Sequence, residues 1–212
     1  MIQKLSQGLE KLNLNLSDAQ IEKIELYIHK VLDFNKTYNL MKAADEDELA
    51  VNHILDSLAA LPYIKEICGE KKSIADIGSG GGCPGIPLAI VLEDKDFTLV
   101  ERMEKRCVFL ESVVSSLQLQ NTKVFCTNVD QLTKETFDVE VFRAFHPFDK
   151  KILQLLFKPL KMNGHLIAYK ARSEKIEEEM QGVKSLIKGY KKIPLTIPFL
   201  EDHERNLVVV QK

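Results

Sequence analysis

The stretch from residue 73 to residue 87, Ser-Ile-Ala-Asp-Ile-Gly-Ser-Gly-Gly-Gly-Cys-Pro-Gly-Ile-Pro, constrains the fold of this chain more than any other. Its apolar run at 74–77 predicts a buried strand, and five glycines follow within eight residues. Glycine accepts positive φ and lets a ligand lie directly against the main chain. Pro84 suits the first turn of a following helix, where the missing N–H costs nothing. A strand, a glycine loop and a helix N-terminus together predict a nucleotide-type binding site.

Two carboxylates near this loop distinguish between cofactors. Gly80-x-Gly82-x-x-Gly85 matches the dinucleotide pattern G-x-G-x-x-G, which is weak evidence when it stands alone. Asp76 lies two residues before the first glycine, where a negative charge gives a pyrophosphate nothing but can meet the ammonium group of an amino acid. Glu101, at the end of the next apolar run, suits the two hydroxyls of a ribose, which NAD and S-adenosylmethionine share. Because S-adenosylmethionine joins an amino acid to an adenosine, Asp76 favours it over NAD.

Strand and helix patterns alternate from residue 73 onward. The predicted strands are 73–77, 96–101, 123–127, 137–142, 164–170, 190–197 and 206–211, and the predicted helices are 84–92, 102–119, 149–160 and 173–185. This alternation predicts an α/β fold with a parallel sheet covered by helices on both faces. The last two strands have no convincing helix between them, so we expect an antiparallel hairpin at one edge. The layout is that of the class I, Rossmann-like S-adenosylmethionine-dependent methyltransferases.

Three helices are predicted before the glycine loop. Ser17 with Gln20, and Asp45 with Glu48, have the spacing of capping boxes at the starts of the second and third helices. Pro62 is expected to close the third helix. We therefore expect a helical extension at 1–65, packed on a methyltransferase domain at 66–212.

Ligands of such sheets bind beyond the carboxyl ends of the strands. The third strand is followed by Val129 and Asp130, which suit the adenine through main-chain groups and a carboxylate. The fourth and fifth strands end at Arg143 and Lys170, with His146 nearby, and these residues are expected to face the methyl acceptor.

Charge divides unevenly along the chain. Residues 1–140 hold 15 Lys and Arg against 23 Asp and Glu, whereas residues 141–212 hold 14 against 8. A basic second half can follow a phosphate backbone, although lysine-rich surfaces are also common on proteins that bind no nucleic acid.

The rest of the composition predicts a cytoplasmic protein. No signal peptide or membrane span is indicated, and we expect a monomer. The four cysteines lack the spacing of a metal site, so we expect reduced, small, buried side chains and no metal.

A resemblance to a known family rests on several motifs in order. They are Tyr38-Asn39-Leu40, His53-Ile54-Leu55-Asp56-Ser57, the glycine-rich stretch from Asp76 to Pro87, Lys105-Arg106, Arg143-Ala144-Phe145, Lys170 and Glu204-Arg205-Asn206-Leu207-Val208-Val209. Over essentially its whole length the chain resembles the bacterial small-subunit ribosomal RNA guanine-N7 methyltransferases (RsmG, or glucose-inhibited division protein B).

The resemblance implies cofactor contacts from several of the residues named above. They are Gly78, Cys83, Val129, Asp130 and Arg143, with Glu101 as the ribose acid. The loop pattern itself adds Asp76, Gly80 and Gly82 as expected cofactor-binding residues. It also implies methyl transfer from S-adenosylmethionine to N7 of one guanine of 16S ribosomal RNA, within the small ribosomal subunit.

No catalytic base is evident, and guanine N7 needs none because it already carries a lone pair. We expect Arg143 and Lys170 to position the guanine or its phosphate through charge-assisted hydrogen bonds. His53 and Asp56, three residues apart, are expected to form a helix-surface hydrogen bond that anchors the N-terminal helices, and a catalytic pair is the alternative.

Other functions remain open at this point. They are a small-molecule methyltransferase with the N-terminal helices as a lid, an NAD-dependent protein, and an RNA-binding assembly factor with a vestigial cofactor site.

Overall fold

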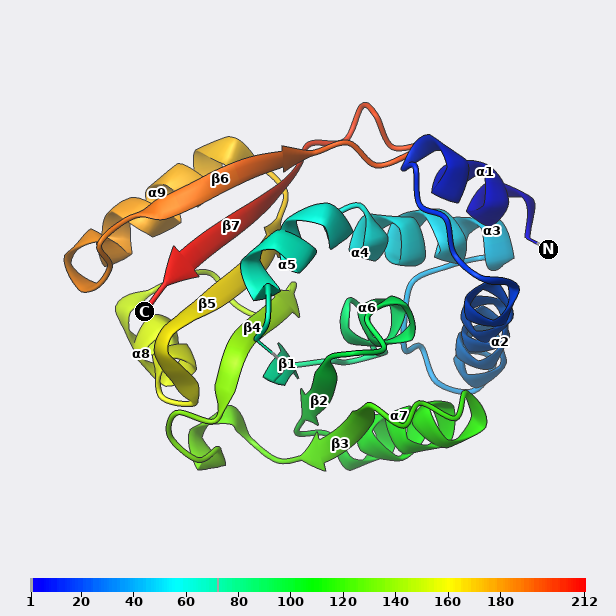
Figure 1. The fold of residues 1–212 in the computed structure, drawn as a ribbon, viewed down its shortest axis with the longest axis horizontal. Helices are drawn as coiled ribbons and strands as arrows, with labels where there is room; N and C mark the ends of the chain where they lie inside the picture. Colours follow the sequence, from blue (N-terminus) through cyan, green and yellow to red (C-terminus); the bar gives the residue numbers. More distant parts are fainter. Residues whose placement is uncertain (1, 72) are drawn as a thin grey trace.

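The computed structural model describes residues 2–71 and 73–212, whose centre is a seven-stranded sheet in the order β3-β2-β1-β4-β5-β7-β6 (Figure 1). The strands are β1 Ser73–Ile77, β2 Asp96–Glu101, β3 Thr122–Cys126, β4 Phe137–Arg143, β5 Leu160–Lys170, β6 Tyr190–Leu195 and β7 Arg205–Gln211. The first five strands pair in parallel, and β7 pairs antiparallel with both β5 and β6. The expected class I methyltransferase fold is therefore confirmed, including the antiparallel edge hairpin.

Alternate residues of the central strands supply two hydrophobic clusters, one on each face of the sheet. Ile74 of β1 belongs to the larger cluster, whereas Ala75 and Ile77 belong to the smaller one. This division follows from the two-residue period of a strand, and burial of both faces explains the nearly continuous apolar sequence of β1.

Helices cover both faces. The helices are α1 Gln3–Lys11, α2 Asp18–Asn35, α3 Glu46–Leu49, α4 Asp56–Leu58, α5 Leu61–Cys68, α6 Gly85–Val91, α7 Glu104–Ser116, α8 Lys150–Phe157 and α9 Ser173–Val183, with a π-helical turn, Ala50–Leu55, between α3 and α4 and 3₁₀ turns at Val129–Gln131 and Lys184–Leu186. Side chains of α1–α7 contribute to the larger cluster, and those of α8 and α9 contribute to the smaller one. The N-terminal helices thus pack on one face of the sheet.

The ends of the N-terminal helices agree with the sequence only in part. Ser17 and Gln20 form the expected reciprocal capping box. Asp45 accepts from the Glu48 main-chain N–H at 2.8 Å, but the Glu48 carboxylate turns to the N–H of Ala44, so this box is not reciprocal. The expectation for Pro62 was wrong. It lies in the first turn of α5, where its missing N–H is harmless, and it therefore begins a helix that the sequence did not predict.

The cysteines also differ from expectation. Cys107 of α7 and Cys126 at the end of β3 form a disulfide, and Cys126 is exposed. Cys68 and Cys83 are free and buried, as expected. Patterns of metal spacing and C-x-x-C pairs could not reveal a bridge across 19 residues, because it depends on α7 packing beside β3.

Two further structural results concern only the described residues. No helix among them is long and apolar enough to cross a membrane. No group of three or more His, Cys, Asp or Glu side chains among them is arranged to hold a metal ion.

Glu140 of β4 generates a prediction about stability. Its side chain is fully buried, and neither carboxylate oxygen has a hydrogen-bond partner among the described residues. Burial holds its pKa well above the ordinary value, against a smaller opposing effect of the Lys212 ammonium. The folded protein therefore keeps this proton at pH values where the unfolded chain releases it, and folding stability falls as the pH rises through that interval.

We expect Glu140→Gln to remove this loss. Urea unfolding from pH 4.5 to 8.5 should show the variant gaining on the wild type as the pH rises, by at least about 1.4 kcal/mol at the alkaline end. A constant difference between the two proteins across the series would contradict the argument.

Candidate functional site

The glycine loop joins β1 to α6 by turning over the end of β2. The N–H groups of Gly78 and Ser79 both donate to the Val100 carbonyl, at 2.9 and 3.0 Å. Gly78 has a φ of +71°, and a Cβ there would lie 2.6 Å from the Phe145 ring. Both the backbone conformation and the close ring therefore require glycine at this position.

Asp76 supports this loop from beneath. One carboxylate oxygen accepts from the Gly85 N–H at 3.0 Å, and the other has no partner among the described residues. Burial raises the pKa of Asp76 to about 6, although the Ser79 hydroxyl and the Gly85 N–H oppose this rise. Asp76 therefore fixes the start of α6.

Glu101 is held rigidly at the end of β2. Its Oε2 accepts from the Gly80 N–H at 2.9 Å, and its Oε1 accepts from the N–H groups of Arg102 and Met103 at 2.8 and 2.9 Å. A carboxylate oxygen can accept two hydrogen bonds, and Arg106 is still 3.7 Å from Oε2. Glu101 thus keeps an acceptor position for a ligand hydroxyl.

A cavity of about 520 Å³ lies in front of these groups. Its wall includes four of the predicted cofactor residues, namely Gly78, Glu101, Val129 and Asp130. They lie at or just beyond the carboxyl ends of the parallel strands β1, β2 and β3, which meet on the same side of the sheet. The volume is within the range of small-molecule sites.

The other predicted cofactor residues are not on this wall. Asp76, Gly80, Gly82 and Cys83 do not line this cavity, and Arg143 lines a neighbouring one.

Cys83 and the loop around it face the N-terminal helices. The buried Tyr27 hydroxyl of α2 donates to the Gly81 carbonyl at 2.6 Å and lies 3.3 Å from the Cys83 sulfur. A Cβ on Gly82 would lie 3.1 Å from the same hydroxyl. Tyr27 therefore holds the glycine loop against α2 through a buried hydrogen bond. The sequence missed this residue because it reads as one more apolar position of an amphipathic helix.

The neighbouring cavity encloses about 740 Å³ at the ends of β4 and β5. Both candidate acceptor residues, Arg143 and Lys170, line it, and so do groups from the N-terminal helices. The segment 144–146 lines both cavities and therefore forms their common wall. His146, expected near the acceptor, belongs to this wall.

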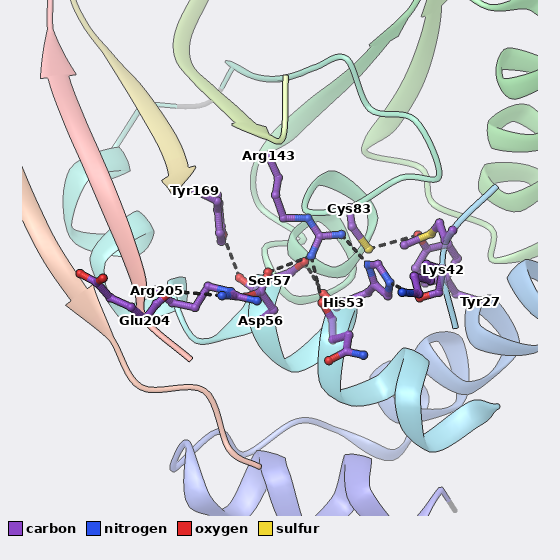
Figure 2. A network of polar contacts seen from close by, with 12 residues as sticks. Tyr27, Lys42, His53, Asp56, Ser57, Cys83, Arg143, Tyr169, Glu204 and Arg205 are labelled. Atoms are coloured by element: carbon purple, nitrogen blue, oxygen red, sulfur yellow. Dashed lines mark hydrogen bonds and ion pairs between the residues drawn. The ribbon is translucent and has the colours of Figure 1, made fainter. Parts of the chain in front are cut away.

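Figure 2 shows Arg143 reaching from β4 into a polar network on the N-terminal helices. Its Nη1 donates to Asp56 Oδ2 at 2.8 Å and to the Asn52 carbonyl at 3.3 Å. Arg205 of β7 approaches the same carboxylate from the other side, its Nε 3.0 Å from Asp56 Oδ1. Asp56 is buried, and its single negative charge is shared between two guanidinium groups.

His53 completes this network as a neutral imidazole. Its Nδ1 lies 2.8 Å from Arg143 Nη2, and because guanidinium nitrogens only donate, Nδ1 must be the acceptor. Its Nε2 then carries the proton and donates to the Lys42 carbonyl at 3.1 Å. Burial, and then the Arg143 charge, lower the pKa of His53, which agrees with this assignment.

The predicted bond between His53 and Asp56 is therefore wrong. Both residues turn to Arg143, since a buried guanidinium requires acceptors that helix spacing alone does not reveal. The sequence also missed Arg205, which stands 149 residues from Asp56.

Lys170 is an ordered cation on the wall of this cavity. Its Nζ lies 2.6 Å from a Glu179 oxygen and 4.9 Å from the centre of the Phe148 ring. Its side chain is 16% exposed. Unlike a free surface lysine, it is held in one position.

Comparison with known proteins gives concordant results. Residues 20–208 match the model of a family described as rRNA small subunit methyltransferase G. The chain is 36% identical to the ribosomal RNA small subunit methyltransferase G of Treponema denticola, over 98% of this chain and 93% of the relative. It is also 36% identical to the protein of that name from Klebsiella pneumoniae, over 100% and 98% of the two chains.

Solved structures share the fold. A methyltransferase from Pyrococcus furiosus aligns over 87% of this chain and 95% of its own, with a TM-score of 0.62 and 14% identity. A predicted O-methyltransferase from Agrobacterium tumefaciens aligns over 76% and 80%, with a TM-score of 0.59 and 19% identity.

The double ion pair at Asp56 generates a second prediction. Asp56→Asn keeps the shape of the side chain but leaves two guanidinium groups without their counter-charge. We expect a loss of about 3 kcal/mol in the free energy of unfolding, measured with urea. Asp33→Asn, at an exposed pair with Lys36, is the matched control and should leave the midpoint unchanged. Equal midpoints for the two variants would show that the network contributes little.

Proposed function

This chain belongs to the rRNA small subunit methyltransferase G family, and we propose that it transfers a methyl group from S-adenosylmethionine to N7 of one guanine in 16S ribosomal RNA of the small ribosomal subunit. The observation that carries the proposal is the pair of adjoining cavities with a common wall at 144–146. One has carboxylates suited to an adenosine, and the other has fixed cations suited to a nucleic acid.

The residues of the smaller cavity fit S-adenosylmethionine. Glu101 keeps an acceptor position for a ribose hydroxyl, and Asp130 supplies a second carboxylate beside the main chain of Val129. Asp76 does not line the cavity, so its buried oxygen without a partner would contribute only negative potential toward a cationic ligand. When bound, S-adenosylmethionine supplies an electrophilic methyl group.

The residues of the larger cavity suit an acceptor that needs no base. Both nitrogens of His53 are engaged, and its pKa is lowered by burial. Guanine N7 is an unprotonated acceptor at an exposed base edge, beside O6. The task of this cavity is therefore orientation, which can contribute about 7–11 kcal/mol to lowering a barrier. Lys170 and Arg143 would hold O6 or a phosphate oxygen.

We further propose that the helical extension, residues 1–65, shapes the acceptor side. Glu48, Asn52, His53 and Asp56 all line the larger cavity, whereas every described residue that lines the smaller one lies beyond position 77. On this proposal the extension selects the acceptor and leaves the cofactor to the sheet.

Methyl transfer tests the proposal directly. Labelled S-adenosylmethionine is incubated with small subunits from a strain that lacks this protein, and with free 16S RNA in parallel. We expect label in one guanine, located by chain cleavage at 7-methylguanosine. Label at another atom would overturn the N7 assignment, and labelling of small molecules alone would favour a small-molecule methyltransferase.

Lys170 gives a separate prediction. We expect Lys170→Ala to raise the KM for small subunits roughly tenfold, because a charge-assisted contact to the RNA is lost, while S-adenosylmethionine affinity stays unchanged. Lys192→Ala is the matched control, since Lys192 also pairs with a glutamate, at 3.0 Å, but lies outside both cavities. Unchanged turnover and RNA affinity in Lys170→Ala would disprove the positioning role.

A further inference from the structure

A third cavity, of about 410 Å³, lies between α5 and the edge strands β5, β7 and β6. It lies toward the amino end of β5, whereas the two cavities described above lie at the carboxyl ends of the parallel strands. Asn163 and His165, in the first half of β5, line it, whereas Lys170 at the end of the same strand lines the acceptor cavity. It is therefore separate from the proposed methyl-transfer site.

Positive charge dominates this cavity. Lys188, Lys191 and Lys212 line it, and Glu66 is the only acid on its wall among the described residues. Lys212 is already engaged, with the Leu160 carbonyl at 2.6 Å and Glu135 at 3.9 Å. Lys188 and Lys191 are exposed and have no ion pair among the described residues. This contrasts with Arg143 and Lys170, whose charges the protein itself neutralises.

The cavity also offers ring faces and a neutral donor. Tyr63 and Tyr190 are 36% and 40% exposed at its wall. Lys71 Nζ lies 2.8 Å from His165 Nδ1, so Nδ1 accepts and the Nε2–H remains available as a donor. Burial, and then the charges of Lys71 and Lys191, lower the pKa of His165, so this imidazole is neutral near pH 7.

Unpaired lysines beside exposed aromatic rings match the chemistry of single-stranded RNA binding. Lysines attract phosphates through counterion release, and aromatic rings stack on bases of any sequence. We propose that this cavity binds a nucleotide of single-stranded ribosomal RNA, with the phosphate near Lys188 and Lys191 and the base against Tyr190. The proposal rests on the proposed RNA substrate and adds a second, distant contact for it.

Such a contact affects affinity and not the chemical step. We expect Lys188→Ala combined with Lys191→Ala to raise the KM for small subunits about tenfold and to leave kcat unchanged. For a contact to one phosphate of a single strand, the magnitude of the slope of log affinity against log salt should fall by about 0.7.

The matched control is Lys123→Ala combined with Lys134→Ala. It removes two exposed lysines that likewise have no ion pair among the described residues, and it leaves all three cavities intact. If the two double variants have equal effects, Lys188 and Lys191 act only through the net charge of the protein, and the proposal is overturned.

Direct binding keeps this test independent of methylation. A fluorescent twelve-nucleotide single-stranded RNA is titrated by anisotropy against the wild type, Tyr190→Leu and Tyr190→Phe. We expect weakened binding for Tyr190→Leu and near-normal binding for Tyr190→Phe, which keeps the ring. A 4-thiouridine probe should cross-link within residues 184–195.

The outcomes separate this proposal from the proposed function. Absent methyl transfer together with cross-linking at this site would contradict the enzyme activity but support the cavity as an RNA contact. Normal methyl transfer with identical RNA binding by all variants would overturn the cavity proposal alone. Adenosine monophosphate or inorganic phosphate competing as well as the RNA would also overturn it, because the site would then take free anions.

Discussion

The paired ionic contacts of Asp56 are the interaction on which the arrangement of the larger cavity depends. Asp56 stands on α4, at the end of the N-terminal helices, and its carboxylate meets Arg143 of β4 and Arg205 of β7. One buried group thereby ties the helical extension to two strands of the sheet (Figure 2). A buried carboxylate is costly unless charges and hydrogen bonds compensate it, so this geometry tolerates little displacement. The Tyr169 hydroxyl adds a neutral link nearby, donating to the Ser57 carbonyl at 2.8 Å.

The segment after β4 connects this constraint to the proposed chemistry. Arg143 ends the strand, and Ala144 follows with a φ of +51°, which turns the chain sharply. Phe145 then packs over Gly78, in the space that a side chain there would occupy. The position of the wall at 144–146 therefore depends on two contacts. One is the pairing of Arg143 with Asp56, and the other is the packing of Phe145 over Gly78. The relative position of the two cavities therefore depends on residues from three separate elements.

The sequence predicted elements well where local pattern decides them, and contacts poorly where tertiary structure does. The bounds of β1 and β2 are as predicted, because a buried parallel strand is a short apolar run between clear breaks. Gly78, Glu101, Val129 and Asp130 come together because parallel strands end at one edge, which is a rule of topology. The orientation of a side chain within a loop follows no such rule. Cys83 stands in the same loop as Gly78, yet it faces Tyr27.

Partners far apart in the chain could not be predicted from the sequence either, because tertiary structure decides which of them meet. Arg143 was predicted to contact the cofactor and to position the acceptor, and the structure pairs it with His53 and Asp56, about 90 residues earlier in the chain.

The distribution of charge has a consequence that net charge conceals. In the larger cavity, Arg143 and Arg205 pair with Asp56, and Lys170 pairs with Glu179. These cations are therefore fixed in position, and much of their long-range attraction for anions is cancelled. In the cavity beside β6, Lys188 and Lys191 have no such partners among the described residues, so their field reaches further into solvent. Attraction of a polyanion and orientation of one base are different tasks, since the first needs unneutralised charge and the second needs rigid geometry. The two clusters of basic residues in the second half of this chain are built differently in that respect, which is the arrangement expected if the chain attracts RNA at one place and orients it at another.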